Sequence, residues 1–459
     1  MLELITVGFF VVACLIAIQK PGWGLALVMT MYAFEQALQG SSGIFLSKLY
    51  LANVAVAVAA GIGAVRAILA QTRPFHGYFS LAWYGIIALF AWALVSLLWT
   101  PAREAALGLT TWGLPYFVLF IIVSPFLVDR IQSIQSFLRA FLIMGFVILL
   151  LIKINPNFTV KYGRLGVTID ALIRSSPLSI GELGGSVMLI AALYRVGVRS
   201  VFFSAIRIGG FLLGVVLSLQ SGSRGQVIFA VLLIVVFYPI STKVKNIGNF
   251  IGTAIGLLIL IPIVLFLASF VLDASELRRW DSDAIAGGSD VRIQNVFDLL
   301  NAFLQQPIAW VAGLGFNAFS AITSGVHEPY SHVLFVDVLT ELGIPMFVIL
   351  CSILWLAGRD ALWLFRRFAD QPVERASISA LLALLVYQML LVNKQGYMWV
   401  AVSFFFFIAA LPRLRARTEM ADAEFEATSD EVDAQYLPHS GEEAPSFQPQ
   451  YHPAPSQKT

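Results

Sequence analysis

The sequence predicts an all-α, polytopic membrane protein, and its composition and its apolar runs are the observations that predict this fold class. Of the 459 residues, 59% are hydrophobic and 12% are charged, against about 45–50% and about 25% in soluble globular proteins. The apolar runs are long enough to cross a bilayer core, which requires about 20 mainly apolar residues per helix. This composition excludes a water-soluble enzyme.

The apolar runs, bounded by charged residues or by Pro and Gly, indicate about twelve or thirteen transmembrane helices. They cover residues 2–18, 22–38, 49–70, 80–99, 108–128, 136–154, 178–194, 205–220, 223–240, 250–272, 331–357, 376–392 and 396–412. The first two runs are short and form either a hairpin of two spans or one broken span. The broken span would leave twelve helices.

Lys and Arg residues gather in alternate loops, and the positive-inside rule assigns such loops to the cytoplasm. The basic residues concerned are Arg66, Arg73, Arg130, Arg139, Arg195, Arg199, Arg207, Lys243, Lys245, Arg359, Arg366, Arg367 and Arg375. Three more arginines follow the last apolar run, at positions 413, 415 and 417. We therefore expect a cytoplasmic C-terminus and, with thirteen spans, an N-terminus on the outer face.

This topology leaves two long segments on the extracytoplasmic face, residues 155–177 and residues 273–330. Both contain basic residues, although outer loops are usually poor in them. These residues are Lys161, Arg164 and Arg174 in the first segment, and Arg278, Arg279 and Arg292 in the second. The pattern indicates either an anionic ligand at this face or contact with lipid phosphates.

The composition changes after residue 417 and predicts two regions. Residues 418–459 hold nine acidic residues and one Lys, so residues 1–417 carry 28 basic and 18 acidic residues, a formal charge of +10. We expect residues 1–417 to form the transmembrane domain and residues 418–459 to be an acidic, disordered cytoplasmic tail. The tail either recruits a partner or has no essential role.

A polar break at residues 221–226 (Ser-Gly-Ser-Arg-Gly-Gln) separates two apolar runs at the predicted outer face. Gly and Ser allow a tight turn, which leaves Arg224 at the N-terminus of the next helix. A guanidinium and the positive end of a helix together favour an anion with paired oxygens, such as a diphosphate. The structural alternative is a plain turn whose Arg reaches the lipid headgroups.

Residues 290–303 place apolar side chains at helical spacing and predict an amphipathic helix at the outer membrane interface, within the large extracytoplasmic loop. Pro307 ends this helix, and a Gly-Leu-Gly-Phe loop follows at residues 313–316. Arg292 falls in the predicted first turn, where the helix dipole disfavours a cation. This misfit favours a role in binding an anion, and an exposed Arg without a role is the alternative.

Residues 327–332 (His-Glu-Pro-Tyr-Ser-His) immediately precede an apolar run that carries Asp337 and Glu341 one helical turn apart. His332 therefore lies at the mouth of a predicted transmembrane helix. A neutral imidazole can accept a proton from a hydroxyl, so His332 is a candidate general base, with Asp337 and Glu341 in support. A structural interfacial His is the alternative.

Several familiar motifs are missing from the sequence. It has no Walker A phosphate loop, so the chain does not itself hydrolyse ATP. It has no His-Glu-x-x-His pair and no cysteine cluster for zinc, and the one Asp-x-Asp sequence, at residues 281–283, is interpreted as loop. We expect no metal, no other cofactor and no nucleic-acid partner.

Three motifs occur in an order that carries a family resemblance. Residues 221–225 contain a Ser-Arg-Gly helix start, and residues 292–319 contain an Arg-led amphipathic helix followed by a Gly-x-Gly loop. Residues 332–345 run from His-Val-Leu to Glu-Leu-Gly-Ile-Pro. Together these motifs resemble those of the O-antigen ligase and Wzy-type polysaccharide polymerase superfamily of bacterial inner membranes. The rest of the chain agrees with that superfamily in hydropathy and in the number of spans.

The resemblance implies a metal-independent, inverting glycosyltransferase on the outer face of the membrane, with a sugar chain on undecaprenyl diphosphate as its activated donor. Arg224 and Arg292 would bind the diphosphate and stabilise charge on the leaving group. His332 would deprotonate the acceptor hydroxyl. Val333 replaces the Asn that is frequent in the family, and His327 is a second candidate base, so the choice between the histidines stays open. Arg164 and Arg174 are candidate supporting residues.

The expected activity is that of a polymerase, which joins lipid-linked repeat units of an exopolysaccharide or O-antigen. A ligase would use the same donor and residues but would pass the chain to lipid A core or to a protein. A transporter or flippase for lipid-linked sugars, from a different class, would show charges buried in mid-span and two related halves. The implied partners are the lipid-linked oligosaccharide, membrane lipids and other polysaccharide export components.

Overall fold

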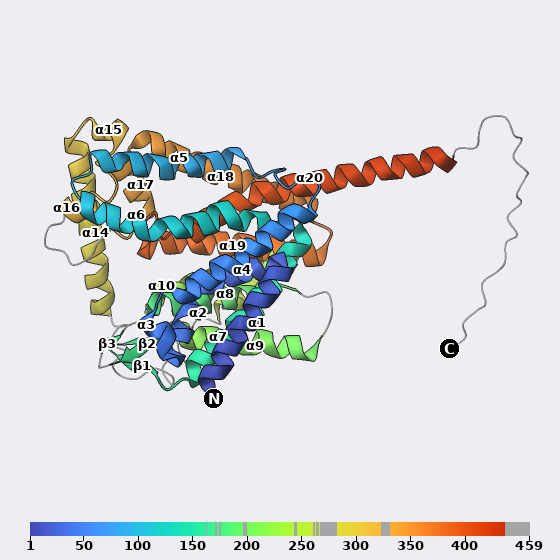
Figure 1. Ribbon diagram of the computed structural model, residues 1–459, viewed down its shortest axis with the longest axis horizontal. Coiled ribbons are helices and arrows are strands. Elements are labelled where there is room, and N and C mark those ends of the chain that lie inside the picture. The colour runs from blue at the N-terminus through green and yellow to red at the C-terminus, as the bar shows by residue number, and fades with distance from the viewer. Residues whose placement is uncertain are drawn as a thin grey trace, which may run out of the picture. The chain divides into compact units, whose positions relative to one another are not determined.

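The protein is mostly helical in the computed structural model (Figure 1). The described residues are 1–161, 163–169, 172–173, 176–195, 200–242, 246–259, 262, 266, 282–322 and 331–436. Nine helices in this part of the chain are long and apolar enough to cross a membrane. The predicted class of an all-α, polytopic membrane protein is therefore confirmed, with one small β-sheet as an addition.

The membrane-length helices occur along the whole transmembrane region. They are α1 (Leu2–Gln19), α4 (Leu51–Ala70), α5 (Leu81–Val95) with a 3₁₀ extension to Leu98, α6 (Arg103–Phe117) with an irregular continuation to Leu127, α7 (Ile131–Ile154), α9 (Val201–Gln220), α10 (Arg224–Thr242), α18 (Ile344–Arg367) and α19 (Pro372–Gln395). The other predicted spans include α2 (Pro21–Ser41), which is more polar, and α8 (Pro177–Leu193), which is shorter. The run at 250–272 begins in α11 (Ile247–Leu258) and lies largely outside the described residues.

The first two apolar runs form two separate helices, α1 and α2, joined at Lys20, which matches the hairpin alternative. Pro21 begins α2, where its missing N–H has no helical partner to lose. At the open end of the pair, the Thr6 and Ser41 hydroxyls lie 3.3 Å apart. Gly22 allows α2 to approach α7, because a Cβ at this position would lie 2.6 Å from the carbonyl oxygen of Ser133.

Small residues bring α8 close to its neighbours α9, α10 and α19. A Cβ on Gly184 would lie 2.8 Å from the carbonyl oxygen of Gly214 on α9, and one on Gly185 would lie 2.0 Å from the Tyr387 hydroxyl on α19. Helices in lipid associate through such close packing, because lipid chains are as apolar as the side chains that they replace. The glycines therefore fix α8 at the centre of this group of helices.

Helix α20 (Val402–Tyr436) begins in the core of the transmembrane unit. Its residues 404–407 are four consecutive, buried Phe, and Phe405 packs edge-on against Phe90 of α5 at 5.3 Å between ring centroids. The predicted span at 396–412 is thus partly a loop and partly helix. The chain divides into two compact units, Met1–Arg417 and Thr418–Thr459.

The tail differs from the prediction of disorder over residues 418–436, which continue helix α20. No Pro or Gly occurs between residues 413 and 437, and Ala, Glu and Met are good helix formers. Residues 437–459 lie outside the described residues.

The segment at 155–177 contains a three-stranded antiparallel sheet that the sequence analysis did not predict. Its strands are β1 (Phe158–Lys161), β2 (Arg164–Ile169) and β3 (Leu172–Ile173), with Phe158 opposite Val167 and Thr168 opposite Ile173. The Thr159 and Thr168 hydroxyls are 2.7 Å apart across the first pair of strands. The sheet contacts α2, α8 and α9.

Two details near the predicted motifs are corrected by the structure. The run at 331–357 is not one helix but two, α17 (Leu334–Leu342) and α18, which break at Gly343 with φ of 89° before Pro345. The amphipathic helix α14 (Ser282–Gln305) begins earlier than predicted. Arg292 therefore lies in the middle of α14 and not in its first turn, so the argument from the helix dipole does not apply to it.

The helices of residues 1–417 begin and finish at two opposite ends of the bundle. At one, named the α14 end, α7, α9 and α19 finish and α8 and α10 begin, as the hydrogen bonds from Lys153 to Gln220 and from Gln226 to Gln395 show. Helices α14 to α17 gather at this end (Figure 1). The opposite, basic end contains Arg375, which donates to the carbonyl of Ser241. Arg207, which donates to the carbonyl of Ala191 near the end of α8, and Arg417, which donates to the carbonyl of Asp129 just before α7, also belong to the basic end.

Removal of residues 418–459 is expected to leave residues 1–417 folded, because the chain divides into two compact units at this position. The midpoint of thermal unfolding of the truncated protein in detergent should lie within about 2 °C of that of the full chain. A fall of about 10 °C, or failure to insert into the membrane, would contradict this independence.

Candidate functional site

The turn between α9 and α10 places Arg224 at the first position of α10. Gly222 adopts φ of 68°, which other residues rarely adopt, and its N–H donates to the carbonyl of Leu219 at 3.0 Å. The Ser221 hydroxyl donates to the carbonyl of Ser218 at 2.7 Å and accepts from the N–H of Ser223 at 3.3 Å. The predicted tight turn is therefore present, and its side chains fix the start of α10.

The last turn of α19 joins α10 to α17 through three consecutive side chains. Gln395 accepts a hydrogen bond from Gln226 of α10 at 3.2 Å, and Asn393 accepts one from the N–H of Phe335 in α17 at 3.2 Å. Between them, Lys394 lies against the backbone of Gly225, since a Cβ on that glycine would be 2.6 Å from Nζ. We name residues 393–395 the α19 junction.

Lys394 brings a second cation to the start of α10, beside Arg224. The sequence analysis did not select it, although it lies between two apolar runs at the predicted outer face. The criterion that drew attention to Lys161, a basic residue on the side where few are expected, would have found it.

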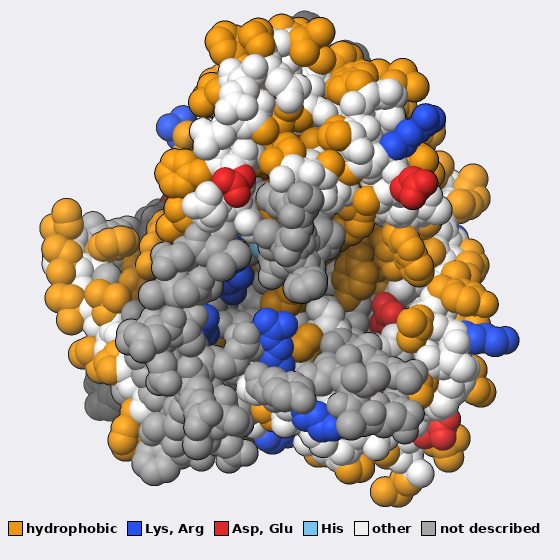
Figure 2. All heavy atoms as spheres, turned by 90° about the vertical axis from the view of Figure 1, so that its left-hand side faces the viewer, with side chains coloured by type: hydrophobic (Ala, Val, Ile, Leu, Met, Phe, Trp, Pro, Cys, Tyr) orange, Lys and Arg blue, Asp and Glu red, His pale blue; other side chains and the backbone are white. Residues whose placement is uncertain are grey.

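Arg292 brings a third cation to this region from α14. Arg292 and Arg224 are close enough for their charges to repel one another. Helix α14 is held there by a small apolar core in which Leu299 and Phe303 pack with residues of the following loop and helices, including Phe319. Figure 2, which faces the α14 end, shows Lys and Arg side chains gathered in a hollow together with a His side chain. Cations that repel one another in a hollow favour binding of an anion.

His332 precedes α17 and is held in a strained backbone conformation. Its φ is 71°, a value that costs a non-glycine residue about 1–3 kcal/mol and that is concentrated at functional sites. The adjacent Ser331 hydroxyl donates to the Asp337 carboxylate and accepts from the N–H of Val333 at 3.1 Å. Asp337 thus holds, through Ser331, the turn that contains His332, a residue that is 9% exposed.

Glu341 holds the Gly-Leu-Gly-Phe loop. Its carboxylate accepts from the N–H of Asn317 at 2.8 Å and from the N–H of Phe319 at 3.2 Å, and its carbonyl accepts from the N–H of Gly315 at 2.9 Å. Gly313 is required for this contact, because a Cβ there would lie 2.0 Å from the Glu341 carbonyl oxygen. Glu341 therefore supports the loop that follows α14.

The end of α5 holds the same loop from its other side. Ser96 accepts from the N–H of Phe316 at 2.9 Å, and Thr100 donates to the Phe316 carbonyl at 2.8 Å. Trp99 Nε1 donates to the Gly313 carbonyl at 3.2 Å. The Gly-Leu-Gly-Phe loop at residues 313–316 and the Glu-Leu-Gly segment at residues 341–343 thus pack together with the end of α5.

Asp337 and Glu341 lie on α17, which is not among the membrane-spanning helices, and both are buried. Burial raises the pKa of Asp337 to about 7, although the Ser331 hydroxyl opposes the rise. Burial also raises the pKa of Glu341 well above its ordinary value, and the nearby Asp337 adds to this effect.

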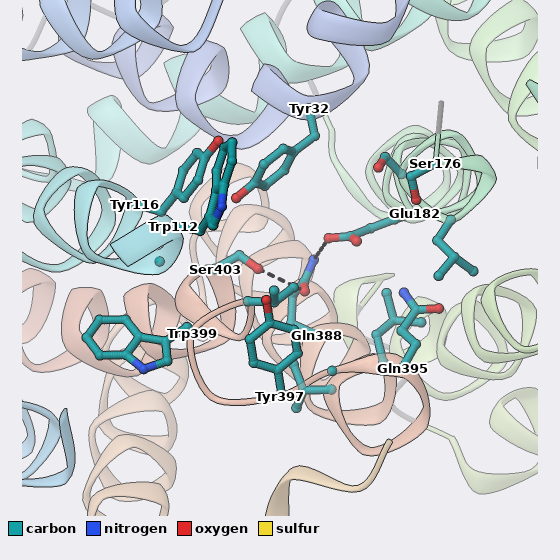
Figure 3. A pocket seen from close by; sticks show the side chains of 17 residues that line it. Tyr32, Trp112, Tyr116, Ser176, Glu182, Gln388, Gln395, Tyr397, Trp399 and Ser403 are labelled. Carbon is teal, nitrogen blue, oxygen red and sulfur yellow. Dashed lines mark hydrogen bonds between the residues drawn. The ribbon is translucent and has the colours of Figure 1, made fainter. Parts of the chain in front are cut away.

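A cavity of about 340 Å³ lies beside the α19 junction and is lined by Gln395 (Figure 3). The rings of Tyr32, Trp112 and Tyr116 lie together on one side of it. On another side, Gln388 donates to the Glu182 carboxylate at 2.7 Å and accepts from the Ser403 hydroxyl at 3.1 Å. The sequence analysis missed this cavity, because its lining comes from α2, α6, α8, α19 and α20.

Of the remaining predicted site residues, the structure describes only Arg164. Arg164 is exposed at the start of β2, on the small sheet. Arg174 and the alternative base His327 lie outside the described residues, as do Arg278 and Arg279. Among the residues that the structure describes, no group of three or more His, Cys, Asp or Glu is placed to hold a metal ion.

The fold and the site define the protein as a polytopic membrane protein with a cationic, histidine-containing centre at one end of its helices. Comparison with protein-family models and with curated proteins finds no match to this chain. An assignment of function therefore depends on the chemistry of the site.

Replacing Glu341 with Ala is expected to destabilise the protein by about 2–4 kcal/mol, because the buried N–H groups of Asn317 and Phe319 lose their acceptor. Glu341→Gln, which keeps one carbonyl oxygen, should lose less. The measurement is thermal unfolding in detergent, with the exposed Glu104→Ala as the control. A midpoint for Glu341→Ala equal to that of the control would contradict this role.

The stability of Asp337→Asn relative to that of wild type is expected to increase as the pH rises from 5 to 8. The folded chain retains a proton on Asp337 up to about pH 7, whereas the unfolded chain loses it near 3.8, so wild-type stability falls across this interval. The difference in unfolding midpoint should grow by a few °C. Asp298→Asn on α14 serves as the control, and parallel pH profiles for wild type and Asp337→Asn would contradict the assignment.

Proposed function

We propose that the protein is a polysaccharide polymerase, which transfers a glycan from undecaprenyl diphosphate to a hydroxyl of a second lipid-linked repeat unit. The observation that carries this proposal is the convergence of Arg224, Arg292 and Lys394 with the strained His332 at one end of a membrane bundle. Three cations suit a diphosphate, and a His beside them suits deprotonation of a hydroxyl.

In the proposed reaction the acceptor oxygen attacks the anomeric carbon of the donor, and the bond between that carbon and the diphosphate oxygen breaks. His332 takes the proton of the attacking hydroxyl as the new glycosidic bond forms, with inversion at the anomeric carbon. Arg224 and Arg292 stabilise the negative charge that develops on the departing diphosphate. The activated donor supplies the driving force, so the reaction needs no ATP.

The proposed location is the bacterial inner membrane, with the α14 end on the extracytoplasmic face and the C-terminus in the cytoplasm. The basic end supports this orientation, since it contains the arginines that the positive-inside rule retains in the cytoplasm. Arg413 lies there, donating to the carbonyls of Val128 and Pro74 at 2.9 and 3.1 Å. A donor that is presented outside the cytoplasm would then meet the cationic centre.

A transporter is less well supported, although acidic residues occur within the helices, among them Glu35 and Glu182 beside the cavity and its aromatic wall. Glu182 is five residues from the start of α8 and Glu35 is six residues from the end of α2, so each lies about 7–9 Å from the α14 end of its helix. These positions belong to the outer part of a core about 30 Å thick. The acidic side chains thus extend the site and do not mark a path across the membrane.

Purified protein incubated with undecaprenyl-diphosphate-linked repeat units and EDTA should produce a ladder of longer lipid-linked chains. Arg224→Ala, Arg292→Ala and His332→Ala should each reduce elongation by at least about 100-fold while still inserting into the membrane. Arg103→Ala removes an exposed arginine at the start of α6 and is the matched control, with normal elongation expected.

Normal product from all three site variants would contradict the proposed site. Transfer to added lipid A core or to a protein, without elongation of the lipid-linked chain, would replace the polymerase proposal with a ligase. Movement of the lipid-linked sugar across vesicles, with no transfer, would replace it with a transporter.

A further inference from the structure

The cavity beside the α19 junction has two chemically different walls (Figure 3). Aromatic rings from α2 and α6 form one wall, in which Tyr32 and Tyr116 lie 5.4 Å apart between ring centroids. The polar wall consists of the hydrogen-bonded chain of Ser403, Gln388 and Glu182. This arrangement suits a ligand with one apolar face and one hydroxyl-rich edge.

The aromatic wall is fixed by a second polar chain outside the cavity. Asn53 donates to the Tyr116 hydroxyl at 2.9 Å and to the Glu35 carboxylate at 3.0 Å, and Gln39 donates to the same carboxylate at 2.8 Å. The ring of Tyr116 is therefore oriented before a ligand enters, which lowers the entropy lost on binding.

We propose that this cavity binds a neutral sugar unit of the lipid-linked glycan. A pyranose ring presents C–H groups on its face and hydroxyls at its edge, so its face packs on the rings of Tyr32, Trp112 and Tyr116. Its hydroxyls donate to Glu182, since a carboxylate accepts several hydrogen bonds and Gln388 provides one. The volume of about 340 Å³ is within the range of about 300–1,000 Å³ for small-molecule sites.

The side chains that line the cavity define the class of sugar. Glu182 lines it, and no Lys, Arg or His occurs among the described residues that form its walls. A uronic acid would place a second carboxyl group near Glu182, and none of the described lining residues carries a cation to compensate it, which is costly away from water. The cavity therefore selects a neutral sugar over an acidic one.

The position of the cavity relates this sugar to the cationic centre. Gln395 lines the cavity and accepts from Gln226, which is two residues after Arg224 on α10. A glycan whose diphosphate lies at Arg224 would thus have a sugar unit within reach of the aromatic wall. The inference rests on the proposed function for the origin of this sugar, whereas the binding of a sugar can be tested without catalysis.

The test measures binding of free trisaccharides to the full chain in lipid nanodiscs by saturation-transfer NMR. Maltotriose, N,N′,N″-triacetylchitotriose and galactotriose are the neutral probes, and trigalacturonic acid is the acidic probe. We expect at least one neutral probe to bind, and the acidic probe to bind at least about tenfold more weakly than that probe.

Trp112→Ala should weaken binding of the neutral trisaccharide about fivefold, and Glu182→Gln should weaken it about tenfold. Glu182→Gln should also reduce the difference in affinity between the neutral and the acidic trisaccharide. Trp112 is 73% exposed, so its loss leaves the fold intact, and the similarly exposed Trp355→Ala on α18 is the matched control with unchanged binding. Absence of neutral binding, unchanged binding in both cavity variants, or displacement of the sugar by sugar-free undecaprenyl phosphate would overturn the proposal.

Two outcomes separate this inference from the proposed function. Sugar binding in a wild-type protein that never elongates a glycan would support the cavity and reject the polymerase. Elongation with no effect of Trp112→Ala or Glu182→Gln on sugar binding would reject the cavity alone.

Discussion

The site depends on the α19 junction, where three consecutive side chains hold parts of the protein that are far apart in sequence. Asn393 binds the backbone at the start of α17, Lys394 lies on Gly225, and Gln395 binds Gln226 at the start of α10. These contacts connect the helix that follows His332 to the helix that begins with Arg224 through α19. Hydrogen bonds between helices in lipid are directional, so the junction also fixes the register of α10 and α17.

The structure stores unfavourable interactions at the same place. Arg224 and Arg292 repel one another, and His332 adopts a backbone conformation that a non-glycine residue rarely takes. Such features persist where the surrounding structure determines them, and here Ser331 and its bond to Asp337 hold the strained turn. Under the proposed function, the diphosphate of the donor would bind between these cations.

The sequence predicts the membrane fold, the turn before Arg224 and the existence of a helix around Arg292, because each depends on local spacing of apolar, Gly and Ser residues. The start of α14 was missed, and so was the break at Gly343, which depends on the close approach of this glycine to the Val311 carbonyl. The position of Lys394 beside Gly225 and the cavity around Glu182 both result from tertiary packing between helices that are distant in sequence. Hydropathy identifies the membrane helices, but it does not specify which helix ends lie next to one another in the folded protein.

The cations at the α14 end are proposed to recognise a lipid diphosphate. Native mass spectrometry of the full chain, titrated with undecaprenyl diphosphate and with undecaprenyl monophosphate, tests this proposal most directly. Wild type should bind the diphosphate at least about tenfold more tightly, and a double variant with Arg224→Gln and Arg292→Gln should lose this preference. Equal binding of both lipids by wild type, or an unchanged preference in the double variant, would contradict the account.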